Sequence, residues 1–121
     1  MELLSPTNPP TSTQPVITDT IPLFSWESYP SANHYVVEVT NAQATVIWGG
    51  FASNWTVRRV LIPSSETSIR FNADTTATES LVPGKVHHWK IYASKDDAQE
   101  PLGWKFISQS EEQRGLIAIA P

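Results

Sequence analysis

The sequence predicts a single all-β domain, and three observations support that fold class. Apolar residues alternate with a period of two in several segments, whereas no long stretch repeats them with the 3.6-residue period of a helix. Ten Pro and five Gly residues interrupt the chain and limit the strands to about 5–8 residues. The 121 residues, 40% of them hydrophobic, suffice for one well-filled core.

The first strands are expected near the N-terminus. Residues 1–20 form a lead that is rich in Pro and Thr and contains the first strand. Because Pro cannot donate a ladder hydrogen bond, this strand belongs at a sheet edge. Residues 21–27 form the second strand, and its alternation places Phe24 and Trp26 on one face.

The middle of the chain supplies four further strand candidates. In residues 35–39 the alternation turns Tyr35, Val37 and Val39 toward the core. The other three candidates are residues 45–48, 56–62 and 67–72.

The strongest strand pattern lies in the last third of the chain. Residues 85–94 alternate over their whole length and place His87 and Trp89 on one face. The last two candidates are residues 104–107 and 116–119. Since Trp89 and Trp26 share the inward phase, we expect the two indoles to lie across from each other between two sheets about 10 Å apart.

Two blocks of sequence carry a resemblance to a known family. Residues 24–27 read Phe-Ser-Trp-Glu and precede a Pro, a small residue and Tyr-x-Val; residues 81–84 read Leu-Val-Pro-Gly and precede an apolar alternation that ends at Ala93. In this order the blocks resemble a fibronectin type III domain of the kind found in bacterial cell-surface and secreted proteins. The resemblance covers residues 3–42 and 80–120. It implies one immunoglobulin-like β-sandwich of about seven or more antiparallel strands.

Two features depart from the family pattern. The corner aromatic is His87, where the family has a Tyr whose hydroxyl bonds back to the backbone. A neutral imidazole nitrogen can make a similar bond. The chain between the two blocks is also longer than in the family, and we interpret residues 43–79 as an insertion. A specific function is most easily placed in such a segment.

Composition argues against several partners. The eight Lys and Arg residues are outnumbered by twelve Asp and Glu, which gives a formal net charge of -4 and predicts no nucleic-acid binding. The absence of Cys excludes disulfides and thiolate chemistry. No apolar window approaches the ~18 residues that a membrane-spanning helix requires, so no membrane insertion is expected.

The sequence also contains no recognisable catalytic or cofactor-binding motif. Nucleophile-elbow, zinc-protease, dinucleotide and phosphate-loop patterns are all missing, so we expect neither an enzyme nor a cofactor. His34, His87 and His88 are the only His residues. Neighbouring strand residues point to opposite faces, so His87 and His88 are poorly placed to share a metal ion.

One cation site is left open as an alternative. Asp96, Asp97 and Glu100 lie together in an expected hairpin loop, and calcium prefers several oxygen ligands. The alternating spacing of a calcium-binding loop is missing, however. Solvated loop charges are the simpler interpretation.

Four aromatic residues are predicted to lie at the surface, because Trp26 and Trp89 already occupy the core. These candidate contact residues are Trp48, Trp55, Tyr92 and Trp104. Exposed Trp and Tyr give much contact area at little cost in entropy, which favours a protein partner or a neighbouring domain of the same chain. They also stack on sugar rings, so carbohydrate binding is the alternative. A third interpretation is that the 43–79 segment folds back over its own rings.

The expected function is therefore that of a non-catalytic structural or protein-interaction module. The first ten residues lack both a basic start and an apolar run, so they do not resemble a signal peptide. We interpret the chain as one domain, residues 1–121, of a longer multidomain bacterial protein. Its expected location is extracytoplasmic, in the cell envelope or secreted.

Overall fold

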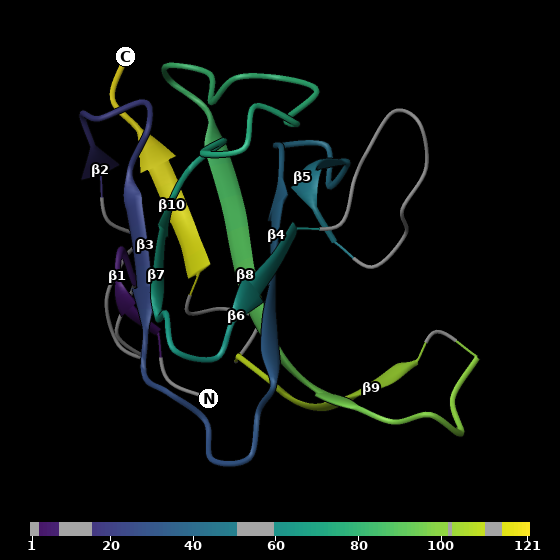
Figure 1. The fold of residues 1–121 in the computed structure, drawn as a ribbon. Coiled ribbons are helices and arrows are strands. Elements are labelled where there is room, and N and C mark those ends of the chain that lie inside the picture. Colours follow the sequence, from purple (N-terminus) through teal and green to yellow (C-terminus); the bar gives the residue numbers. More distant parts are fainter. Residues whose placement is uncertain (1–2, 8–15, 51–59, 102, 111–114) are drawn as a thin grey trace.

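The computed structural model describes the chain in five stretches, residues 3–7, 16–50, 60–101, 103–110 and 115–121. These residues form ten β-strands and no helix, which confirms the all-β prediction (Figure 1). The strands are β1 (Leu3–Ser5), β2 (Val16–Ile17), β3 (Leu23–Trp26), β4 (His34–Thr40), β5 (Val46–Gly49), β6 (Val60–Pro63), β7 (Ser68–Arg70), β8 (Val86–Asp96), β9 (Trp104–Gln109) and β10 (Leu116–Ile119).

The strands form two sheets. A three-stranded sheet has the order β1-β3-β7, and a seven-stranded sheet has the order β2-β10-β8-β4-β5, in which β6 also pairs with β4 and β9 with β8. The pairs are antiparallel, as predicted, except that β2 runs parallel to β10. The N-terminal lead thus contributes one strand to each sheet, since β1 pairs in the smaller sheet and β2 in the larger.

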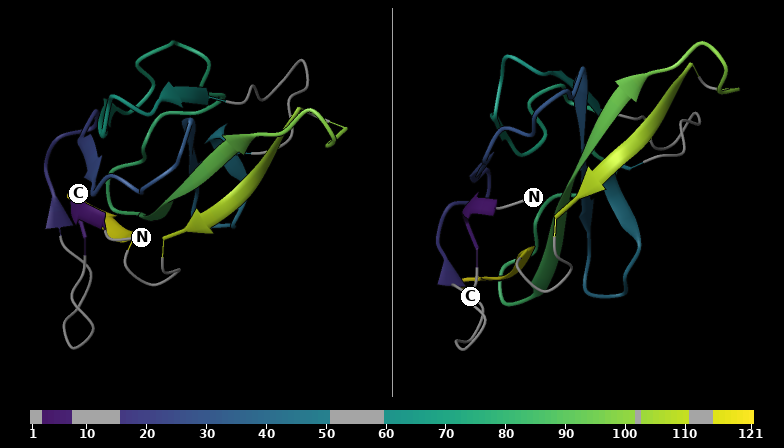
Figure 2. Two further views of the ribbon diagram at one scale, coloured as in Figure 1. Left: turned by 60° about the horizontal axis from the view of Figure 1, so that its bottom comes forward. Right: turned by 90° about the horizontal axis from the view of Figure 1, so that it is seen from below.

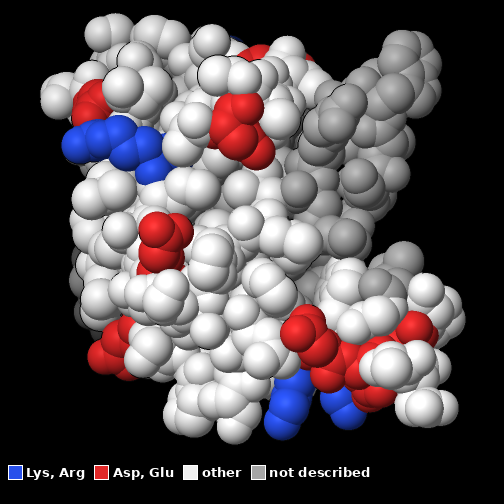
Figure 3. All heavy atoms as spheres, in the orientation of Figure 1, with Lys and Arg blue, Asp and Glu red and all other residues white. Residues whose placement is uncertain are grey.

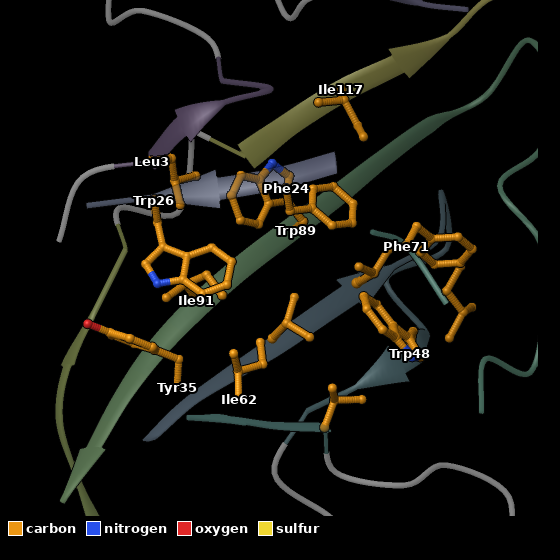
Figure 4. Close-up of a cluster of buried hydrophobic side chains, with 14 of the residues drawn as sticks. Leu3, Phe24, Trp26, Tyr35, Trp48, Ile62, Phe71, Trp89, Ile91 and Ile117 are labelled. Atoms are coloured by element: carbon orange, nitrogen blue, oxygen red, sulfur yellow. The ribbon is translucent and has the colours of Figure 1, made fainter. Parts of the chain in front are cut away.

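The two sheets pack against each other across a shared apolar core (Figure 4). Phe24 on β3 and Trp89 on β8 are in ring contact, with centroids 4.6 Å apart. Trp26 on β3 is equally buried, and its ring lies 5.5 Å from that of Tyr35 on β4. The prediction that Trp26 and Trp89 belong to one core formed by two facing sheets is confirmed.

Two buried aromatic side chains of the core form hydrogen bonds with backbone groups outside their own strands. The Trp89 indole Nε1 donates to the Pro6 carbonyl at 2.8 Å, which fixes the segment that follows β1 against β8. The Tyr35 hydroxyl accepts from the backbone N–H of Tyr29 at 2.8 Å and so holds the turn before β4. The Trp26 indole Nε1 is also buried, but it has no hydrogen-bond partner in the described part of the chain.

The segment of residues 43–79 contributes to the core. It supplies β5, β6 and β7, and its described part places Ile47, Trp48 and Phe71 in the buried cluster. The strand candidates at residues 45–48 and 67–72 correspond to β5 and β7. Part of the candidate at 56–62 lies outside the described residues.

His87, at the start of β8, is buried as its alternation predicts. His87 is 1% exposed, with the predicted inward phase, but neither ring nitrogen makes a hydrogen bond of normal geometry with the described residues. The imidazole thus does not make, with normal geometry, the backbone bond that a neutral ring nitrogen could make there. Burial lowers the pKa of His87 below its ordinary value of 6.5, while the Lys85 backbone and the Glu79 carboxylate act in the opposite direction.

Gly115, the residue directly before β10, lies close to the backbone of β8. A Cβ atom at Gly115 would overlap the backbone carbonyl oxygen of Trp89. Glycine is therefore required on steric grounds where the chain re-enters the sheet to form β10.

Candidate functional site

β8 extends beyond the core and forms a hairpin with β9 that projects from the body of the molecule (Figure 2). The first part of β8 pairs with β10 and the last part with β9. The hairpin turn is closed by backbone hydrogen bonds from Asp97 to Gly103 and from Glu100 to Asp97.

Three rings form a row on the outer face of the hairpin. Tyr92 alternates with inward-facing neighbours on β8 and therefore points outward. Phe106 and Trp104 lie opposite Ser94 and Asp96 and project to the same side. The ring centroids of Tyr92 and Phe106 are 5.2 Å apart, and those of Trp104 and Phe106 are 4.8 Å apart. We call these three residues the aromatic row.

The aromatic row continues into apolar residues on the neighbouring strands. Val36 on β4 lies opposite both Tyr92 on β8 and Leu61 on β6. Leu61 and Phe106 are 45% and 39% exposed. An outward sheet face is ordinarily polar, whereas this one carries large apolar side chains across four strands. We call Leu61, Val36 and the aromatic row together the apolar stripe.

A shallow hollow of about 390 Å³ adjoins the aromatic row. Its lining residues are Tyr92, Phe106, Ile107, Ser108 and Gln109. Most of this lining is apolar, and the hollow opens to the surface. It is large enough to receive an apolar side chain from a partner.

Both acidic and basic groups lie near the hairpin, at the lower right of Figure 3. The Lys90 ammonium lies 5.6 Å from the centroid of the Tyr92 ring, within reach of a cation–π interaction. His34 Nδ1 lies 3.6 Å from Asp96 Oδ1, and Lys105 Nζ lies 3.4 Å from Asp97 Oδ2. The stripe therefore has exposed apolar residues at its two ends, Leu61 and Phe106, a buried centre at Val36 and Tyr92, and charged groups nearby.

The acidic residues of the hairpin loop have structural roles. Asp97 Oδ1 accepts a hydrogen bond from the Gln99 backbone N–H at 3.0 Å. That bond lowers the pKa of Asp97 below its ordinary value, with a further contribution from Lys105. The described residues contain no group of three His, Cys, Asp or Glu side chains that could hold a metal ion. The calcium alternative at Asp96, Asp97 and Glu100 thus gains no support from the structure.

The structure brings together only two of the four predicted contact residues, Tyr92 and Trp104. The prediction that Trp48 is exposed is wrong, because Trp48 is 0% exposed. It pairs with Val39, and both side chains face the core. Its ring lies 5.3 Å from that of Phe71, and its Nε1 donates to Asp74 Oδ1 at 2.9 Å. Trp55 lies outside the described residues.

Tyr92 points outward, as predicted, but the prediction that it is exposed is wrong. Its side chain points outward, but only 6% of the residue is exposed, and Phe106 and Lys90 both lie against its ring. Sequence reasoning missed Phe106, the more exposed ring. The alternation of Trp104 and Phe106 on one strand is the signal that places both on the same face.

Comparisons of the chain with protein-family models, with curated proteins and with solved structures found no match. Among the described residues there is no helix long and apolar enough to cross a membrane.

Proposed function

We propose that this chain is a fibronectin type III-like β-sandwich and acts as a non-catalytic protein-interaction module of an exported, multidomain bacterial protein. The order of the strands supports the fold. The smaller sheet joins β1, β3 and β7, and the larger sheet places β4 and β10 on either side of β8. In immunoglobulin-like domains the first, second and fifth strands share one sheet in the same way, and the third, sixth and seventh share the other.

The apolar stripe is the observation that carries the interaction function. Protein interfaces combine a centre of aromatic and aliphatic side chains with a polar rim, and aromatic anchors supply much of the binding energy. Phe106 and Leu61 are exposed at opposite ends of the stripe, whereas Val36 and Tyr92 between them are 0% and 6% exposed. The charges of Lys90 and Asp96 border it. This is the composition expected of a protein-binding surface.

The ionisable groups support a non-catalytic role. Among the described residues the pKa values of Asp74, His87 and Asp97 are lowered. His87 lies near one end of the 11-residue β8, and Asp97 follows its other end, so roughly 30 Å separates them. Asp74 bonds to the Trp48 indole. Each shift thus has its own structural cause, and the three groups do not form one catalytic cluster.

Carbohydrate binding is less well supported than protein binding. Sugar rings stack on exposed, flat aromatic faces. The planes of Tyr92 and Phe106 are inclined by 43°, and those of Trp104 and Phe106 by 71°, so the row offers no flat platform. Trp48 is buried and unable to stack on a sugar.

Site-specific photo-crosslinking tests the proposed function. Phe106 is replaced by p-benzoylphenylalanine in the organism that encodes the chain, and Leu23 is replaced in a parallel strain. Leu23 is a matched control, because it is 45% exposed and lies on the smaller sheet, away from the stripe. We expect a discrete protein adduct from position 106 and none from position 23.

Adducts from neither position, or from both equally, would contradict a protein-binding role for the stripe. The carbohydrate alternative is tested separately with soluble glycans at millimolar concentration. Saturable quenching of Trp fluorescence that is lost on Trp104→Ala would favour that alternative over the proposed one.

A further inference from the structure

His87 is enclosed at one end of the sandwich without a hydrogen-bond partner for its ring. It is the second residue of β8, lies opposite Ile117 on β10 and is 1% exposed. Both ring nitrogens are buried from solvent, and neither makes a hydrogen bond of normal geometry with the described residues. The buried Ser94 and Ser110 do form such bonds. His87 is therefore an exception to the rule that buried polar side chains are hydrogen-bonded.

Two segments flank this end of β8. The β4–β5 turn (residues 41–45) follows Thr40, which lies opposite His88, and the corner segment (residues 79–85) leads directly into β8. Figure 1 shows both segments at the upper end of the sandwich. A hollow of about 220 Å³ is lined by residues of both segments and by His87. It gives the side chains around the imidazole room to rearrange.

The two segments are held in different ways. Backbone hydrogen bonds tie the corner segment to β10, from Gly84 to the Ile119 carbonyl and from Ile119 to the Lys85 carbonyl, both at 2.9 Å. A side-chain bond joins the β4–β5 turn to the corner segment, since Asn41 Nδ2 donates to Glu79 Oε1 at 3.4 Å. This bond is long and exposed, so it stabilises the contact only weakly. The turn is therefore the more easily displaced of the two segments.

Ionisable side chains lie on two of the elements around His87. On β8 and just before it these are His88, which faces the opposite side of the sheet, and Lys85. On the corner segment it is Glu79, which lines the hollow. Glu38 of β4 lies further along the sheet. The β4–β5 turn, β10 and the core-facing positions of the smaller sheet carry no charged side chain.

We propose that protonation of His87 opens this end of the sandwich by drawing Glu79 away from Asn41. The proton comes from solvent and turns both ring nitrogens into donors. An enclosed imidazolium without an acceptor is costly, so the ring must gain a carboxylate or water. When Glu79 turns toward the imidazolium, the β4–β5 turn loses its bond to the corner segment and separates from it. This inference is independent of the protein-interaction function, because β8 contributes Tyr92 to the apolar stripe further along the strand.

The direction of the effect follows from the pKa of His87 in the two forms. In the closed form burial lowers this pKa below 6.5, while the Lys85 backbone and the Glu79 carboxylate act in the opposite direction. In the open form the ring has an ordinary or higher pKa, so this form takes up the proton first as the pH falls below 6.5. When protonation is complete, the opening equilibrium has risen tenfold for each pH unit that separates the two pKa values. We expect the closed form to dominate at neutral pH.

An NMR titration of the intact, isotope-labelled chain from about pH 8 to about pH 5 tests this inference. The ring nitrogens of His87 report its protonation, and the backbone amides of residues 41–45 report the position of the turn. We expect His87 to titrate with a midpoint below 6.5. The turn amides should shift, and exchange faster with solvent, with that same midpoint. The amides of β3 are the internal reference and should not exchange faster.

Four variants separate the groups involved. Glu79→Gln removes the carboxylate but keeps an acceptor for Asn41, so the His87 midpoint should fall further and the turn should stay closed to lower pH. Glu66→Gln is the matched control, since Glu66 is an exposed carboxylate between β6 and β7, and it should change neither. His87→Phe should abolish the pH-dependent shift of the turn. His88→Gln alters the opposite face of the same strand and should retain that shift.

Three results would contradict the inference. A His87 midpoint at or above 6.5 in the unchanged chain would show that the ring is already solvated. Turn amides that do not follow the His87 midpoint, or equal responses of Glu79→Gln and Glu66→Gln, would show that the carboxylate does not drive opening. Faster exchange of the β3 amides with the same midpoint would show that the whole domain unfolds instead of opening at one end.

Discussion

Replacing Trp89 with Phe is expected to destabilise the fold more than the same replacement at Trp26. The two indoles are matched in burial, at 0% and 1% exposed, and each contacts another aromatic ring. They differ in hydrogen bonding, because Trp89 Nε1 donates to the Pro6 carbonyl whereas Trp26 Nε1 has no partner among the described residues.

The difference in destabilisation can be estimated from this contrast. Both replacements lose apolar surface and leave a small cavity, which costs about 1–2 kcal/mol each. Trp89→Phe also leaves the Pro6 carbonyl buried without its donor, which costs about 1–3 kcal/mol more. Trp26→Phe removes a buried N–H that has no partner, which recovers a similar amount. Trp89→Phe should therefore be more destabilising by at least about 2 kcal/mol.

Urea denaturation followed by far-UV circular dichroism measures this difference, since it does not depend on Trp fluorescence. The denaturant slopes of the two variants should agree, so that the midpoints report stability alone. Losses that are equal within about 0.5 kcal/mol, or a larger loss at Trp26, would refute the assigned role of the Trp89–Pro6 hydrogen bond.

Three other substitutions or conditions give further predictions. Gly115→Ala should cost about 1–3 kcal/mol of stability in urea denaturation, because its Cβ would overlap the Trp89 carbonyl; no loss would contradict the close approach. Asp74→Ala should lower the unfolding free energy by about 1–3 kcal/mol, because the buried Trp48 indole loses its acceptor; a thermal midpoint equal to that of the unchanged chain would contradict this. His87 has a lowered pKa in the folded state, so the unfolded chain takes up its proton first as the pH falls below 6.5. Stability should therefore decrease through that window, and His87→Phe should remove part of the decrease; an identical pH profile for the variant would contradict it.

Strand alternation predicted the centre of the core correctly. The period-two pattern assigned Phe24, Trp26 and Trp89 to inward faces, and all three are buried there. That prediction depends only on local geometry, because successive side chains of a strand point to opposite faces. The same rule gave the outward direction of Tyr92 and the inward direction of His87.

The incorrect predictions concern features that depend on pairing between distant segments. The strand around Trp48 was predicted, but its inward face depends on its register with Val39. Tyr92 is covered because β9 places Phe106 against its ring. The parallel pairing of β2 with β10 likewise joins the two ends of the chain, and no local pattern contains that information.

The central claim is that the outward apolar stripe binds a protein, and the most direct measurement is the identity of whatever lies within crosslinking distance of Phe106 in the living cell. The proposed function predicts one defined polypeptide bound through Phe106, with the equivalent label at Leu23 remaining unattached. A Phe106 label that captures no polypeptide while the chain stays folded would contradict that function.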